Sequence, residues 1–86
     1  MGGKTTNVRV LYFAVARELA SKSVETFTLS EGSSVGDLAK EVQKTHPALK
    51  TLRNSAKFSV NLAVVDDSTI LKNGDEVGVL PPVAGG

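Results

Sequence analysis

Few side chains in this sequence could do chemistry on a substrate. The 86 residues include no cysteine, which excludes disulfides, thiolate nucleophiles and Cys-based metal sites. The single histidine, His46, precedes Pro47, a context typical of a helix end, and a metal site needs several convergent ligands. The carboxylate pairs Asp66–Asp67 and Asp75–Glu76 lie beside turn residues, where Asp hydrogen-bonds the backbone. We therefore expect neither a bound metal nor side-chain catalysis, since no serine has a His-plus-carboxylate set available to it.

The remaining candidate is the C-terminal segment LPPVAGG, Leu80 to Gly86. Its two prolines fix φ at about −65° and favour an extended spacer. Its two glycines lack a Cβ and permit close approach of another backbone. Fully extended, the last four residues span at most roughly 13 to 14 Å, enough to thread a channel in a partner. The alternative interpretation is a frayed terminus whose prolines only end a strand.

The composition is that of an ordinary globular domain. Hydrophobic residues make up 41% and charged residues 22% of the chain, and the formal net charge is +1, with both signs interspersed. A nucleic-acid surface would require clustered basic charge. No apolar run approaches the roughly 20 residues that span a bilayer, and no signal-like segment opens the chain. We expect one cytoplasmic domain without nucleic-acid or membrane partners.

Hydrophobic periodicity divides the chain into a leader, one domain and a tail. Residues 1–7 are polar and small and predict a disordered leader. Residues 8–82 form the expected domain, and residues 83–86 the flexible tail. β-Branched and aromatic runs predict strands. These runs are Val8–Phe13, Val24–Leu29, Phe58–Val65 with a turn near Asn61, and Val77–Leu80, and Ala14–Ala20 is helical or turn-like.

One amphipathic helix follows the second strand. Ser34 is a suitable N-cap with Asp37 three residues later, a capping-box pattern that places an acidic group at the helix N-terminus. Pro47 stops the helix. The apolar residues recur at helical spacing and form one stripe, which comprises Val35, Leu38, Ala39 and Val42.

The order of strand, strand, helix and further strands predicts an α+β fold. A mixed sheet wrapped around one main helix is the β-grasp, ubiquitin-like arrangement. The helix stripe is narrow and can cover only one side of that sheet. The other side, with Phe13, Val64 and Leu80, is expected to stay open. Such an open apolar surface indicates either a partner or, as the alternative for Val64 in particular, a core position.

Two segments closely resemble the MoaD family, the sulfur-carrier small subunits of molybdopterin synthase. They are VRVLYFAVAREL near the start and LKNGDEVGVLPPVAGG at the end, and the resemblance spans Val8 to Gly86. Its most specific part is GDEV followed by PPV and the terminal Gly-Gly. The tail departs from the family only in Ala84, where Thr or Ser is often seen.

The resemblance implies chemistry at the carboxylate of Gly86. A ubiquitin-activating-like adenylyltransferase would adenylate it with Mg-ATP, and a sulfur donor protein would supply the sulfur of a thiocarboxylate. The large subunit of the synthase would use that sulfur to build the dithiolene of molybdopterin. The carrier itself would bind no cofactor and supply no catalytic side chain, because the catalytic residues are expected on the large subunit.

The resemblance also implies a docking surface for the large subunit, in a heterotetramer with two large subunits at its centre. The partner-binding residues would be Phe13, Val64, Leu80, Pro81, Pro82, Val83, Ala84 and Gly85.

Three other functions share parts of this pattern. A sulfur carrier for thiamine or tRNA thiolation shares the fold and the thiocarboxylate, although the PPV spacer favours the pterin pathway. A ubiquitin-like modifier of lysines shares the Gly-Gly end, but such modifiers usually carry a basic residue where Val83 and Ala84 stand. An inert β-grasp interaction module would use no chemistry at the tail. One residue added after Gly86 should disable a carrier and leave an interaction module unaffected.

Overall fold

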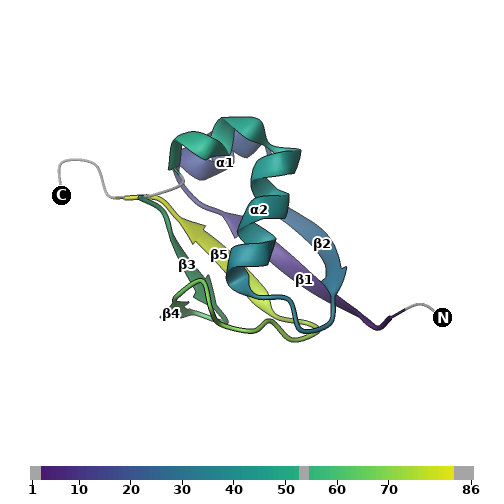
Figure 1. Ribbon diagram of the computed structural model, residues 1–86. Coiled ribbons are helices and arrows are strands. Elements are labelled where there is room, and N and C mark those ends of the chain that lie inside the picture. The colour runs from purple at the N-terminus through teal and green to yellow at the C-terminus, as the bar shows by residue number, and fades with distance from the viewer. Residues whose placement is uncertain (1–2, 53–54, 83–86) are drawn as a thin grey trace.

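A computed structural model, which describes residues 3–52 and 55–82, shows a five-stranded mixed sheet with its longest helix on one face (Figure 1). The strand order is β2-β1-β5-β3-β4. β1 pairs in parallel with β5, and the other three neighbouring pairs are antiparallel. The predicted α+β class and β-grasp arrangement are confirmed. The elements are β1 (Thr5–Tyr12), α1 (Val15–Ala20), β2 (Val24–Ser30), α2 (Val35–Thr45), the 3₁₀ helix η1 (Pro47–Leu52), β3 (Lys57–Val60), β4 (Ala63–Val65) and β5 (Glu76–Leu80).

The first strand begins at Thr5, so the predicted disordered leader was wrong for residues 5–7. Thr6 is buried and continues the inward alternation of the strand. The amide of Asn7 donates to Oδ1 of Asn73 at 2.8 Å, and its carbonyl accepts from the amide of Gly74 at 2.8 Å. Thr5 and Asn7 are polar because they face outward, and Thr6 is a polar residue at an inward position, so the composition of this segment concealed its pairing with β2. Residues 1–2 lie outside the described residues.

Helix α2 begins and ends where the sequence predicted. The Ser34 hydroxyl accepts from the amide of Asp37 at 3.2 Å, and the Asp37 carboxylate accepts from the amide of Ser34 at 2.9 Å. Hydrogen bonding with the backbone and side chain of Ser34 holds the pKa of Asp37 below its ordinary value. His46 is the C-cap, and Pro47 begins η1. The capping box thus fixes the N-terminus of α2, and Pro47 fixes its C-terminus.

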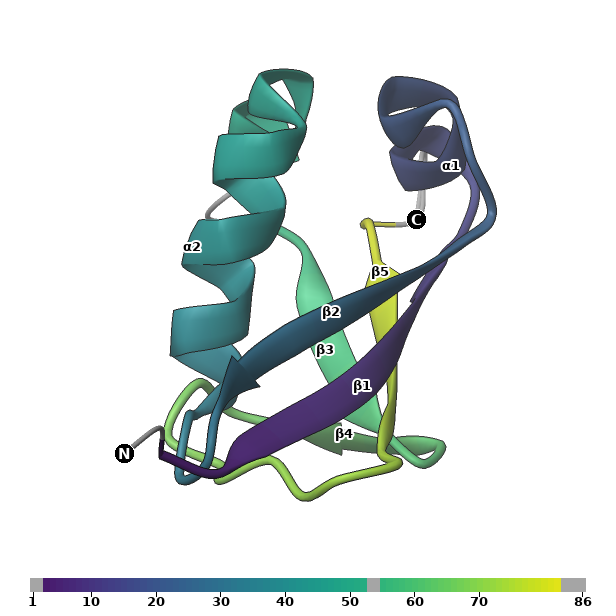
Figure 2. The same cartoon turned by 90° about the vertical axis from the view of Figure 1, so that its right-hand side faces the viewer.

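The core fills the space between α2 and the inner face of the sheet, which lie opposite each other in Figure 2. Val35, Leu38 and Val42 of the predicted stripe are buried, and Ala39 is partly buried. They pack against inward residues of β1 and β5, and Leu49 of η1 closes one end. The buried hydrophobic residues are Val8, Val10, Tyr12, Ala16, Ala20, Leu29, Val35, Leu38, Val42, Leu49, Leu71, Val77 and Val79.

The second half of the sheet is built by a tight hairpin and a central strand. β3 and β4 are joined by Asn61 and Leu62, both with positive φ, which confirms the predicted turn. β5 is hydrogen-bonded on both sides, by β1 and β3, and ends just before Pro81. Proline has no amide hydrogen to donate, so it ends this central strand as expected. Within the described residues, the helices are too short or too polar to span a membrane.

Candidate functional site: the outer face of the sheet and the C-terminal tail

One face of the sheet is left uncovered by α2. We call it the outer face and define it by Leu11, Phe13, Ser59, Val64, Gly78 and Leu80. Strand pairing aligns Leu11 with Gly78, Gly78 with Ser59, and Ser59 with Val64. Directly paired residues project from the same side of a sheet. These four residues therefore form one row across the outer face, at right angles to the strands.

Phe13 and Leu80 meet over Gly78. A Cβ placed on Gly78 would lie 3.2 Å from Cε2 of Phe13 and 3.8 Å from Cδ2 of Leu80. The Phe13 ring is 45% exposed and Leu80 is partly buried. Two of the side chains predicted to dock a partner, Phe13 and Leu80, thus lie on either side of Gly78 at the end of β5 that leads to Pro81.

Val64 lies at the other edge of the outer face, on β4. Its side chain is 62% exposed, so it is not a core residue, which settles the alternative considered for this position. Two strands, β3 and β5, separate Val64 from Phe13. The outer face therefore runs from β1 to β4, with apolar side chains at both ends and the small residues Ser59 and Gly78 between them.

The outer face is framed by charge. Nη1 of Arg9 lies 3.0 Å from Oε2 of Glu76, and both side chains are exposed. Lys57 is exposed and pairs with Leu80, so it projects from the same side. An apolar strip inside a polar border is typical of a surface that docks another protein.

The predicted reactive segment begins at the end of β5. Pro81 is partly buried and Pro82 is exposed. The predicted sites Val83, Ala84, Gly85 and Gly86 lie outside the described residues. Tyr12 pairs with Val79, so Phe13 and Pro81 follow their strands at the same end of the sheet. Helix α1 lies at this end (Figure 2). Strand β5 thus contributes Gly78 and Leu80 to the outer face and leads directly into Pro81.

A sequence model described as the ThiS family matches residues 10–86. The chain belongs to the ThiS family. It is similar to the molybdopterin synthase sulfur carrier subunit of Chlamydomonas reinhardtii, with 40% identity over 81 residues that cover 92% of this chain and 98% of the relative.

Solved structures of similar proteins agree with this membership of the ThiS family. A putative molybdopterin converting factor subunit 1 from Pyrococcus furiosus has a TM-score of 0.83 and 37% identity, over 91% of this chain and 99% of its own. Small archaeal modifier protein 1 from Methanosarcina acetivorans has a TM-score of 0.84 and 27% identity, over 98% and 100%. A complex of subunits 1 and 2 of the molybdopterin-converting factor from Helicobacter pylori contains a chain with a TM-score of 0.66 and 28% identity, over 94% and 100%.

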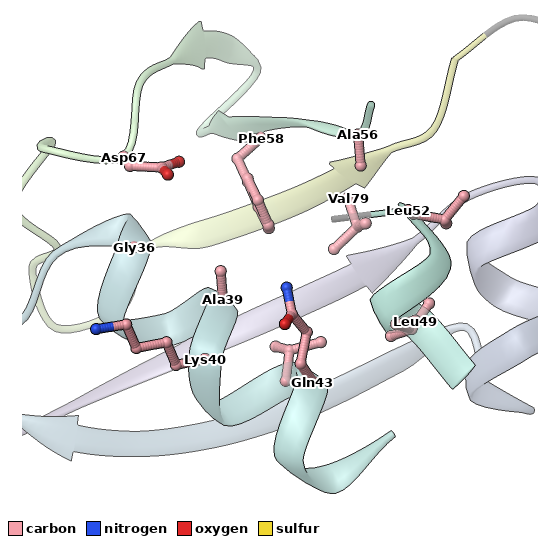
Figure 3. Close-up of a pocket in the computed structure, with 11 residues that line it drawn as sticks. Gly36, Ala39, Lys40, Gln43, Leu49, Leu52, Ala56, Phe58, Asp67 and Val79 are labelled. Carbon is pink, nitrogen blue, oxygen red and sulfur yellow. The ribbon is translucent and has the colours of Figure 1, made fainter. Parts of the chain in front are cut away.

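A groove of about 530 Å³ opens on the opposite side of this ThiS family member, between α2, η1, β3 and β5. Figure 3 shows Ala39 of α2 facing Phe58 and Val79 across the groove, with Lys40 and Asp67 toward one end. The described residues that line it include no histidine, cysteine or hydroxyl group. No cluster of three or more metal-ligating His, Cys, Asp or Glu residues occurs in residues 3–52 and 55–82. Among the described lining residues, the ionisable side chains are Lys40 and Asp67.

Sequence reasoning missed a hydrogen-bonded group of three side chains on the inner side of the sheet. The Tyr12 hydroxyl donates to Oε1 of Glu25 at 2.9 Å, and Nε2 of His46 lies 2.7 Å from the same oxygen. The Tyr12 and His46 rings meet edge to face with centroids 5.8 Å apart. Burial raises the pKa of Tyr12, and so does its hydrogen bond to the Glu25 carboxylate. Burial acts to raise the pKa of Glu25, but the hydrogen bonds from His46 and Tyr12 outweigh it and lower that pKa.

This group is a structural tie. His46 caps α2, as its position before Pro47 predicted, and it anchors that cap to β2 through Glu25. One signal in the sequence could have revealed it: Glu25 alternates with Phe27 and Leu29, so it faces inward. An inward carboxylate requires a hydrogen-bonding partner.

Proposed function

We propose that this chain is the sulfur carrier subunit of a molybdopterin synthase. The observation that carries the proposal is its 40% identity, over 98% of the relative's length, to a protein of that name. In this role the Gly86 carboxylate is adenylated, converted to a thiocarboxylate, and donates its sulfur to the dithiolene of molybdopterin. The expected location in the cytoplasm is part of the same proposal.

The chemistry needs activation by another protein. A carboxylate oxygen is a poor leaving group, so one oxygen is first bonded to the α-phosphorus of ATP, which releases pyrophosphate. Sulfide-level sulfur delivered by the donor protein then attacks the acyl carbon: the carbon–sulfur bond forms as the carbon–oxygen bond to AMP breaks, so AMP leaves and the terminus becomes a thiocarboxylate. The Mg-ATP belongs to the activating adenylyltransferase, whose site stabilises the developing charge. The carrier contributes a terminus that reaches into that site and needs no cofactor of its own.

The described residues support this role as a rigid base for the tail. β5 is held by β1 and β3 on its two sides up to Leu80. Pro81 and Pro82 restrict φ in the segment that follows, which lowers the entropy lost when the tail is ordered in a partner.

We further propose that the large subunit docks on the outer face. The support is the exposure of Phe13 and Val64 and the similarity to a chain in a complex of subunits 1 and 2. We expect a heterotetramer of two large and two small subunits, with the two large subunits at its centre. The catalytic side chains would then belong to the large subunit.

The test is intact mass spectrometry after incubation with the cognate adenylyltransferase, ATP and a sulfur donor. A mass gain equal to the replacement of one oxygen by sulfur, located at Gly86, is the expected result. Gly86→Ala and a variant with one residue added after Gly86 should remain folded and abolish sulfur transfer. Unmodified mass with every cognate activating system, or normal pterin product from Gly86→Ala, would contradict the proposal.

The same experiment separates the alternatives. A carrier for thiamine or tRNA thiolation would gain the sulfur but fail to support dithiolene formation by the large subunit. A modifier would appear attached to lysines, and similarity to small archaeal modifier protein 1 makes this the second candidate to test. An inert interaction module would remain unmodified.

A further inference from the structure

Leu62 stands at the tip of the β3–β4 hairpin in an unfavourable setting. Its φ is +76°, in the left-handed region, and its side chain is 93% exposed. Tight hairpin turns of this kind favour Asn or Gly, because a larger side chain clashes with its own backbone at positive φ. Leucine at this position therefore does not stabilise the isolated domain, because its side chain is not buried and its backbone conformation is unfavourable.

The tip is held in place. The amide of Asn61 donates to the carbonyl of Glu76 at 2.8 Å, and Oδ1 of Asn61 accepts from the amide of Glu76 at 3.0 Å. Nδ2 of Asn61 also donates to Oδ1 of Asp75 at 3.0 Å. Three hydrogen bonds thus tie the turn to the start of β5, and Leu62 is presented to solvent from a fixed backbone.

The tip is continuous with the outer face. Leu62 lies two residues before Val64, the exposed apolar residue at the β4 end of that face. Lys57 pairs with Leu80 and Val60 with Val77, so β3 runs away from the tail and its hairpin lies at the opposite end of the sheet. Three residues of strand separate these pairs, roughly 10 Å. The hairpin tip therefore places an exposed apolar residue at the end of the sheet farthest from Pro81, beside the β4 edge of the outer face.

We propose that Leu62 is a second anchor for the large synthase subunit, which would offer an apolar socket beside groups that face Arg9 and Glu76. The inference rests on the proposed function, and continuity with the proposed docking surface selects this partner. A leucine fixed in position before binding fills such a socket with little further loss of entropy. It adds to Phe13, Val64 and Leu80 a contact that the resemblance did not imply.

The test is calorimetric titration of the full-length chain into the purified large subunit. Leu62→Gly removes the side chain and suits the left-handed turn, so the variant should be at least as stable as the wild type. We expect its Kd to rise about tenfold, the usual consequence of removing a buried anchor. Leu62→Asn, which also suits the turn, should behave alike. The matched control is Ile70→Thr, which removes an aliphatic group that is 54% exposed but lies outside the outer face.

The outcomes separate this inference from the proposed function. An unchanged Kd for Leu62→Gly, with Phe13→Ala weakening binding, would overturn the role of Leu62 and leave the docking surface standing. A wild-type chain that does not bind the large subunit would overturn the proposed function itself. Loss of self-association in Leu62→Gly, without a change in Kd, would assign the side chain to a second copy of this chain and overturn the inference.

Discussion

Gly78 gives the sharpest test of how the outer face is packed. A Cβ at this position would lie 2.6 Å from Oγ of Ser59, closer than such atoms approach in proteins, and 3.2 Å from Cε2 of Phe13. Gly78 lies in β5 and is not among the glycines with positive φ, so alanine meets no backbone strain there. The loss of stability expected for Gly78→Ala is therefore steric, and it comes from contacts of the new Cβ with Oγ of Ser59 and Cε2 of Phe13.

The magnitude follows from opposing effects. Overpacking of this kind destabilises by about 1–3 kcal/mol. Alanine also restricts the unfolded chain, which stabilises by about 0.4–1 kcal/mol. We expect a net loss of about 1 kcal/mol, which lowers Tm by about 4–8 °C in a domain of this size. Because Ser59 is buried, rotation of its hydroxyl out of the way is restricted.

The assay is a double-mutant cycle with Ser59→Ala, followed by urea and thermal unfolding. Removal of the Ser59 hydroxyl eliminates the 2.6 Å contact, and the exposed Phe13 ring can move to relieve the other. The double variant should regain wild-type stability to within about 0.5 kcal/mol, with a coupling free energy of about 1–2 kcal/mol. Full stability of Gly78→Ala alone, or failure of Ser59→Ala to restore it, would refute the packing described for this face.

Two further predictions concern the scaffold. Ser34→Ala removes the α2 cap and should lower the unfolding free energy by about 1 kcal/mol, measured by urea denaturation, and an unchanged midpoint would contradict the capping role. The pKa of Glu25 is lowered in the folded state, so its contribution is complete above its ordinary value of 4.5 and is lost as pH falls through the lower folded-state value. Glu25→Gln should therefore flatten the fall in stability below pH 4.5, and an acid limb as steep as that of the wild type would contradict the tie to Tyr12 and His46.

Elements with local signals could be predicted from the sequence. The capping pair and Pro47 fix the two ends of α2 through contacts within a few residues, and the turn at Asn61 is equally local. In each case the residues that determine the structure are close together in the chain, so a short segment of sequence is enough to predict it.

Features that depend on distant partners could not be predicted. The start of β1 is fixed by hydrogen bonds between Asn7 and the turn at Asn73–Gly74, 66 residues away. Glu25 and His46 are 21 residues apart, and their contact requires β2 and the end of α2 to be in place. Leu62 looked like an ordinary apolar residue near a turn, and only the backbone reveals its positive φ and full exposure.

The position of Leu62 bears on how the chain after Pro81 would be oriented relative to a bound partner. In the proposed docking, an apolar patch around Phe13 and Leu80 alone would fix where the large subunit binds but would leave its rotation about that patch weakly determined. A second contact at the far end of the sheet, roughly 10 Å or more along β3, would fix the rotation as well. β5 connects the two regions, since Asn61 is tied to its start and the tail leaves from its end. If both anchors are engaged, the direction in which Pro81 leaves the domain is set relative to the partner, and a tail of only a few residues can reach a buried site.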